Sequence, residues 1–137
     1  MNVEIFVTTK FSGKVTNGKG AYAIALRLEG KPETAKIHVA GWRNLSYQKL
    51  NTRAVVDAIQ CMVAPAHIVL YIDNLYAEHM IEKGTAKGNA HQELWNTFFE
   101  IAEHMESVKV IRDVKHLYSE RLIQEINAGG YSVIEDR

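Results

Sequence analysis

Several features are scarce in this sequence, and each scarcity excludes a class of protein. The only cysteine, Cys61, cannot form an internal disulfide and excludes most cysteine metal sites, so we expect a core position for it and a cytoplasmic location. Lys plus Arg and Asp plus Glu both number 16, so the chain lacks the net positive charge that drives non-specific binding to phosphate backbones. No apolar run approaches membrane-spanning length and no export signal is visible, so we expect no membrane partner.

The remaining composition favours one globular domain over residues 1–137, because 47% of the residues are hydrophobic and no linker interrupts them. Apolar periodicity predicts strands over Val3–Thr9, Ala21–Leu28, Thr34–Trp42, Ile68–Ile72 and Val108–Val114. It predicts helices over Thr52–Met62, with Thr52 as the cap, and over Leu75–Glu82, His91–Met105 and Tyr118–Asn127. This order favours an α/β fold with a mixed five-stranded sheet, three antiparallel strands followed by two parallel ones, and helices on its faces. The segment after Gly130 is strand-like as well.

Asp73 is the first candidate for chemistry, because it stands at the end of the unbroken β-branched and aromatic run Ile68–Ile72. In open α/β sheets, ligands bind outside the carboxyl ends of the strands. The alternative is that Asp73 caps the helix that begins near Leu75, where an aspartate accepts free N–H groups of the first turn.

The order of elements, together with several short strings, resembles ribonuclease H of the small bacterial type. The matching strings are VEIF (3–6), GAYAIALR (20–27), AGW (40–42), NTRA (51–54), YIDNLY (71–76), ELW (93–95), VKH (114–116) and SERLIQEI (119–126). The resemblance covers nearly the whole chain and implies a ribonuclease H-like fold.

The resemblance also implies which acidic residues should be present. The family's enzymes hold two Mg²⁺ ions, about 4 Å apart, with four carboxylates. The matching positions here carry Thr8, Val55, Asp73 and Ile123, so only one carboxylate is retained. We therefore expect no stable metal site and no cofactor, with Asp73 held instead by a helix N–H group or by the hydroxyl of Thr8 or Thr9.

A relocated Mg²⁺ site would have to combine Asp73 with Asp113 and Glu120, the acids nearest to it in this alignment. His116 matches a loop histidine to which the family assigns proton transfer or product release, although a loop histidine is more often an ordinary surface residue. A site for a nucleic-acid phosphate and 2′-hydroxyl is implied at residues 51–53. Asn51, Thr52 and Arg53 are competent for that role, and helix capping by Thr52 beside a solvated Arg53 is the alternative.

Three functional hypotheses follow, in order of preference. The first is a catalytically silent ribonuclease H-like domain that binds an RNA–DNA hybrid or another nucleic acid weakly, or serves a protein partner. Its basic rim would consist of Lys10, Lys14, Lys19 and Arg53. The second is a structural or protein-interaction module with apolar positions at Trp42 and Tyr47. The third is an active hybrid ribonuclease with the relocated Mg²⁺ site.

Overall fold

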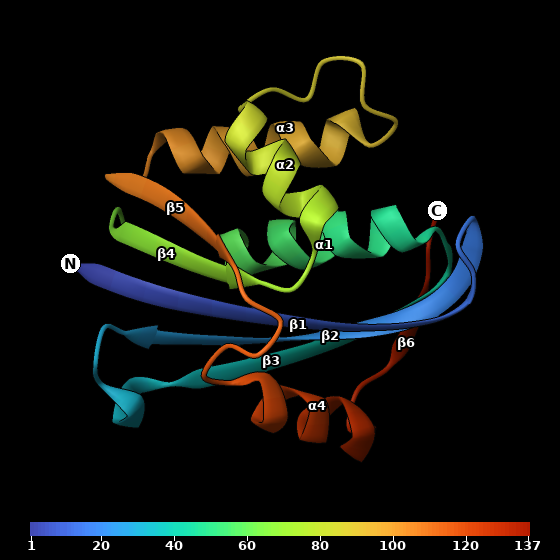
Figure 1. Cartoon of the computed structure of the whole chain (residues 1–137), viewed down its shortest axis with the longest axis horizontal. Helices are drawn as coiled ribbons and strands as arrows, with labels where there is room; N and C mark the ends of the chain where they lie inside the picture. Colours follow the sequence, from blue (N-terminus) through green and yellow to red (C-terminus); the bar gives the residue numbers. More distant parts are fainter.

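The computed structural model describes all 137 residues, and its centre is one six-stranded mixed sheet (Figure 1). The strand order across the sheet is β5-β4-β1-β2-β3-β6. The strands are β1 (Asn2–Lys14), β2 (Asn17–Leu28), β3 (Lys36–Leu45), β4 (His67–Ile72), β5 (Ser107–Arg112) and β6 (Val133–Glu135). A short 3₁₀ turn, Pro32–Thr34, joins β2 to β3.

The pairing of the strands confirms the predicted fold class and corrects the strand count. β1, β2 and β3 form an antiparallel meander, and β4 and β5 continue it in parallel beside β1. The sheet has a sixth strand because Val133–Glu135 pairs in parallel with Gly41–Arg43 of β3. That short segment could not be assigned to a sheet from its sequence, since three residues carry little periodicity.

Four helices cover the two faces of the sheet: α1 (Tyr47–Gln60), α2 (Leu75–Lys83), α3 (Gln92–Glu103) and α4 (Ser119–Ala128). Figure 1 shows α1, α2 and α3 together on one side and α4 alone on the other. We call these sides the α1 face and the α4 face.

Both faces of the central strands are buried, which explains their nearly continuous apolar sequences. On β1, Ile5 and Val7 point into the main core cluster, which also contains Trp95 and Phe98 of α3. Phe6 points the other way, into a smaller cluster with Leu122 and Ile126 of α4. The alanines of β2 on that side, at positions 21, 23 and 25, leave room for α4 to lie close to the sheet.

The capping residues of two helices differ from the predictions, although α2 begins at Leu75 as predicted. Helix α1 begins at Tyr47, five residues before Thr52, because the Ser46 side chain accepts a hydrogen bond from the Lys49 N–H group and caps it. Helix α2 is capped by Asn74, which accepts from the Ala77 N–H group at 2.8 Å, so the capping role proposed for Asp73 is wrong.

Cys61 is also misplaced by the sequence prediction. Helix α1 ends at Gln60 and Cys61 follows it with an exposed side chain, so it is not a core residue. None of the four helices combines the length and apolar character that crossing a bilayer requires.

Candidate functional site

The Asp73 carboxylate lies at the end of β4 and is held by a single neighbouring residue, Thr9 of β1. Its Oδ2 accepts from the Thr9 N–H group at 3.0 Å, and the Thr9 hydroxyl donates at 3.2 Å to Oδ1. The contact with the Thr9 hydroxyl is one of the contacts expected for the Asp73 side chain, although Thr9 lies within β1 rather than at its end. Burial raises the pKa of Asp73, and the hydrogen bonds from Thr9 oppose that rise only in part.

His116 lies beside this site, and its hydrogen bonds fix its protonation state. Its Nε2 lies 3.0 Å from the Val7 carbonyl oxygen, which can only accept, so Nε2 carries the proton. Its Nδ1 lies 3.2 Å from the Tyr118 N–H group, which can only donate, so Nδ1 carries none. The Thr8 hydroxyl oxygen lies 3.0 Å from Nε2 and is a second hydrogen-bond partner of that nitrogen.

These contacts make His116 a buried, neutral member of the fold rather than a surface residue. Burial lowers its pKa, and only 4% of the residue is exposed. A proton on Nδ1 would break the Tyr118 hydrogen bond, so a role in proton transfer has no geometric support here.

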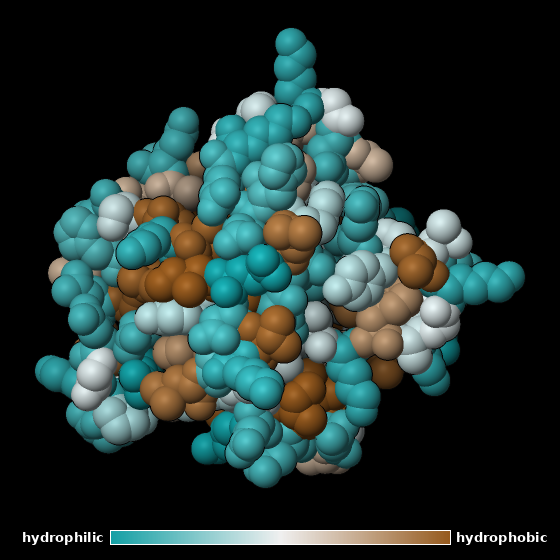
Figure 2. Space-filling view, viewed as in Figure 1, coloured by the Kyte–Doolittle hydropathy of each residue, from teal (hydrophilic) through white to brown (hydrophobic).

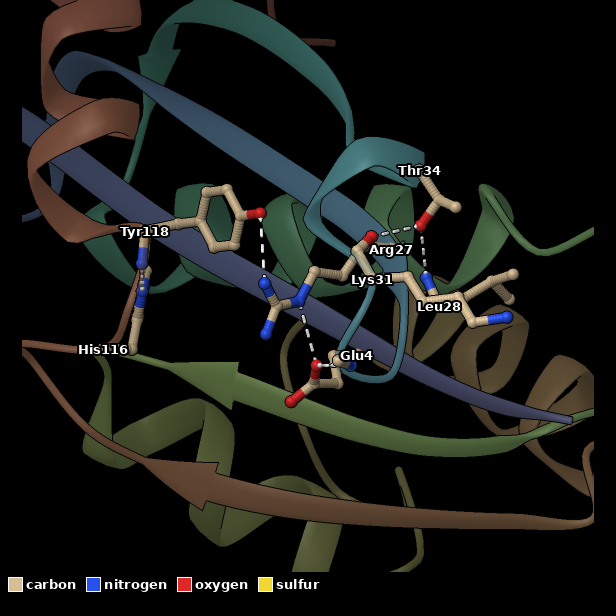
Figure 3. A network of polar contacts seen from close by, with 8 residues as sticks. Glu4, Arg27, Leu28, Lys31, Thr34, His116 and Tyr118 are labelled. Carbon is tan, nitrogen blue, oxygen red and sulfur yellow. Dashed lines mark hydrogen bonds and ion pairs between the residues drawn. The ribbon is translucent and has the colours of Figure 1, made fainter.

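An ion pair in the sheet holds the loop that carries His116. Figure 3 shows Arg27 of β2 lying between Glu4 of β1 and Tyr118, the residue before α4. The Arg27 Nε group donates to Glu4 Oε1 at 2.9 Å, and its guanidinium lies over the Phe6 and Tyr118 rings at 5.5 and 5.4 Å. Tyr118 is thereby fixed, and its N–H group is the donor to His116.

Two of the other family-like metal positions carry the apolar residues Val55 and Ile123. Val55 is 2% exposed inside the main core cluster, and Ile123 is half-buried on α4. No three His, Cys, Asp or Glu side chains converge anywhere in the protein as a metal site would require. Asp113 is exposed and accepts from the Lys115 N–H group of its own loop, and Glu120 is exposed as well. The residues present do not fit a two-Mg²⁺ site, because the positions that match the family's other three carboxylates hold Thr8, Val55 and Ile123.

The structure separates the three residues proposed for phosphate and 2′-hydroxyl contact. Asn51 and Thr52 are 1% and 0% exposed, and they donate to the carbonyls of Tyr47 and Gln48 in their own helix. Neither side chain faces a ligand, and this part of the prediction is corrected. Their position one turn inside α1 explains the error, because the sequence placed them at the helix start. Only Arg53 reaches the surface.

The lysines of the predicted rim lie together on the α4 face. In antiparallel pairs, residues directly opposite one another point to the same face of a sheet. Ser12 of β1 pairs with Lys19 of β2, which in turn pairs with Arg43 of β3. Lys10 and Lys14 lie two residues before and after Ser12, so they point to the same face of the sheet as Ser12. The Lys10 ammonium donates to Asn127 Oδ1 of α4, which identifies the face. We call this set, Lys10, Lys14, Lys19 and Arg43, the basic strip.

Arg53 belongs to a second basic group, on the α1 face, which the sequence did not identify. Lys49 and Arg53 both bind the carboxylate of Asp136, with Lys49 Nζ at 2.6 Å from Oδ2 and Arg53 Nε at 2.8 Å from Oδ1. The Arg53 guanidinium lies 3.9 Å above the Trp42 ring. Trp42 is therefore covered and is not a free apolar position. The one feature of the sequence that could have identified this group is the i,i+4 spacing of its two cationic residues, which places them on the same side of a helix. We call Lys49, Arg53 and Asp136 the tail cluster.

The comparisons with known proteins support the fold. No protein-family model matches the sequence, and no curated protein matches it significantly. Solved structures match clearly, and the fold is ribonuclease H-like. RNase H1 from the archaeon Halobacterium salinarum NRC-1 has a TM-score of 0.71 at 10% identity, over 90% of this chain and 93% of that chain.

Two further structures give the same result. The N-terminal RNase H domain of a Mycobacterium tuberculosis protein, solved as a fusion with maltose binding protein, has a TM-score of 0.68 at 12% identity, over 92% and 95% of the two chains. LC11-RNase H1, solved in complex with an RNA/DNA hybrid, has a TM-score of 0.69 at 9% identity, over 89% and 91%. At these identities the likeness concerns the fold, and function has to be argued from the side chains.

Proposed function

We propose that this protein is a catalytically silent ribonuclease H-like domain that binds nucleic acid weakly, through contacts with the phosphate backbone. The observation that carries the absence of catalysis is the state of Asp73. Its two carboxylate oxygens are both engaged by Thr9, while the matching family positions hold Thr8, Val55 and Ile123. Hydrolysis of the kind the family performs needs metal ions to activate water and stabilise the leaving oxygen, and the chain offers no ligand set for them.

The basic strip supports nucleic-acid binding. Four cationic side chains on one face raise the local positive potential even though the whole protein has no net charge. They lie on three adjacent strands, β1, β2 and β3, and cationic side chains of this kind contact phosphates without reading bases. An RNA–DNA hybrid is the first ligand to test. A cytoplasmic location stays part of this proposal, based on the cysteine content.

A protein-interaction role is the second candidate, favoured by exposed apolar side chains in the loop between β5 and α4. Val114 and Leu117 are 63% and 70% exposed there. Figure 2 shows apolar and polar side chains interspersed on the face it displays, so a partner would meet a mixed surface.

One experiment tests both halves of the proposal. A fluorescent RNA–DNA hybrid is titrated with the protein in EDTA, Mg²⁺ and Mn²⁺, and both anisotropy and cleavage are measured. We expect no cleavage in any buffer and salt-sensitive binding that Lys14→Glu with Lys19→Glu weakens about tenfold or more. Lys87→Glu with Lys109→Glu, at exposed positions outside the strip, is the matched charge control. Metal-dependent cleavage that Asp73→Asn abolishes contradicts catalytic silence. Equal loss in both double variants contradicts the strip as the binding surface.

A further inference from the structure

The segment after α4 connects the two faces of the protein. Figure 1 shows it running from α4 past the edge of β3, as β6, to end near the first turn of α1. Three residue pairs join β6 to β3, and the Asp136 N–H group adds one hydrogen bond to the Arg43 carbonyl at 2.9 Å. Val133 and Ile134 are 52% and 49% exposed. Little apolar area therefore holds this strand, and it can detach without disturbing the core.

Polar contacts, in contrast, hold the end of this segment. Only 6% of the Asp136 side chain is exposed, and both of its oxygens are bound by cations of α1. Its neighbour Glu135 contacts Arg43 and Asn44 but is 53% exposed. One acid of the segment is thus inserted into a basic site, while the adjacent acid lies at the surface.

The basic site has supports other than Asp136. The Trp42 ring supports the Arg53 guanidinium from below, through a cation–π contact. Lys49 lies one helical turn before Arg53 on the same side of α1. A planar guanidinium beside an ammonium group binds phosphate oxygens with the same geometry as carboxylate oxygens. If the segment left, two cations would be exposed in a preformed arrangement.

We propose that Lys49 and Arg53 form a phosphate-binding site that the Asp136 carboxylate occupies in the free protein and that a nucleic-acid phosphate occupies when β6 detaches. The segment then acts as an internal competitor that weakens nucleic-acid binding. This inference rests on the proposed function for its ligand. It differs from that proposal in assigning the control of affinity to Asp136 rather than to the basic strip.

The test compares two acids of equal charge. Asp136→Asn removes the competitor, and Glu135→Gln makes the same change in net charge one residue away. With a fluorescent single-stranded RNA and the hybrid as probes, we expect Asp136→Asn to bind about tenfold more tightly than wild type, the scale for losing charge-assisted hydrogen bonds. Glu135→Gln should change affinity by about twofold or less. Equal gains in the two variants would reduce the effect to net charge and overturn the inference.

Two more variants keep the outcome decisive. Arg53→Gln combined with Asp136→Asn should lose the gain, and a persistent gain would overturn the site. Gly41→Ala should release the segment with Asp136 intact, because a Cβ at Gly41 would meet the Tyr131 ring at 2.4 Å. We expect faster hydrogen exchange at the Asp136 amide in Gly41→Ala and a gain in affinity close to that of Asp136→Asn. Faster exchange without a gain would contradict the competition.

A measurement with inorganic phosphate separates this inference from the proposed function. In Asp136→Asn, phosphate should shift the Arg53 Nε–H resonance at concentrations about tenfold lower than in wild type. If no variant binds nucleic acid but this shift appears, the proposed function fails and the site stands. If nucleic acid binds but neither the gain nor the shift appears, the inference fails and the proposed function stands.

Discussion

Two aspartates of this protein are held in opposite ways. Asp73 is bound by a hydroxyl and a backbone N–H group, whereas Asp136 is bound by an ammonium and a guanidinium group. Burial raises the pKa of Asp73 because no cation contacts it. Burial would also raise the pKa of Asp136, but the hydrogen bonds from Lys49 and Arg53 outweigh it and hold that pKa below its ordinary value.

The difference shows how a site's surroundings decide its use. The Asp73 site joins strands β1 and β4 in the middle of the sheet, next in sequence to the buried contact between Thr8 and His116, so it belongs to the framework of the fold. The tail cluster joins helix α1 to Asp136, the residue that follows β6, an edge strand of three residues. The Asp73 site, with neutral hydrogen-bond donors, has a structural role. The Asp136 site has cationic donors beneath a weakly held segment, so a competing anion can bind there.

The largest expected effect lies on the Asp73 side of the comparison. His116→Ala should lower the free energy of unfolding by about 2–3 kcal/mol, because it leaves a cavity and deprives the Tyr118 N–H group and the Thr8 hydroxyl of their partner. Chemical denaturation measures the loss, and Leu117→Ala in the same loop, at a position 70% exposed, is the control with little expected change. A loss below about 0.5 kcal/mol for His116→Ala would contradict a structural role.

A smaller effect is expected at the carboxylate itself. Asp73→Asn should retain the fold and cost at most about 1–2 kcal/mol, since the amide oxygen still accepts from the Thr9 N–H group. Thr9→Val, which removes the hydroxyl and keeps the N–H group, should cost a similar amount and raise the pKa of Asp73 further. Loss of folding in Asp73→Asn would mean that the negative charge is itself required.

The two carboxyl groups should titrate on opposite sides of the ordinary aspartate value, about 3.9. NMR of the side-chain carboxyl carbons should place the midpoint of Asp73 above this value and that of Asp136 below it. The stability that Asp136 contributes is therefore present above the ordinary value and is lost as the pH falls through its lower folded pKa. Asp73 has the reverse sign: ionisation inside the fold is disfavoured, so its contribution weakens stability as the pH rises through its raised pKa. Arg53→Gln should move only the Asp136 midpoint, upward.

The smallest effect expected is that of Mg²⁺. Because a ligand stabilises only a state that it binds, millimolar Mg²⁺ should leave the melting temperature unchanged in wild type and in Asp73→Asn. A Mg²⁺-dependent rise in wild type that disappears in Asp73→Asn would show that the Thr9 contacts yield to a metal, and would return the active ribonuclease to consideration.

The sequence alone determined the order of the helices and of the first five strands, and it placed Thr8, Val55 and Ile123 at positions that match carboxylates in the family it resembles. Apolar runs such as Ile68–Ile72 depend on local periodicity, which a single chain displays directly. Thr8, Val55 and Ile123 could be matched to those positions because the strand and the two helices that contain them were predicted. The contact between Thr9 and Asp73 was expected because Asp73 follows a strand that lies beside the first strand, although that first strand continues past Thr9 to Lys14.

Only the tertiary structure decided which polar groups meet. Asn51 and Thr52 turned inward because α1 begins at Tyr47, a boundary that depends on the Ser46 cap and on packing against the sheet. The basic residues separated onto two faces because strand register places Lys19 beside Arg43 on the α4 face, whereas Lys49 and Arg53 belong to helix α1, which covers the other face. Asp136 binds Arg53 from 83 residues away, a distance over which no local pattern in the sequence carries information, since the contact exists only once β6 pairs with β3.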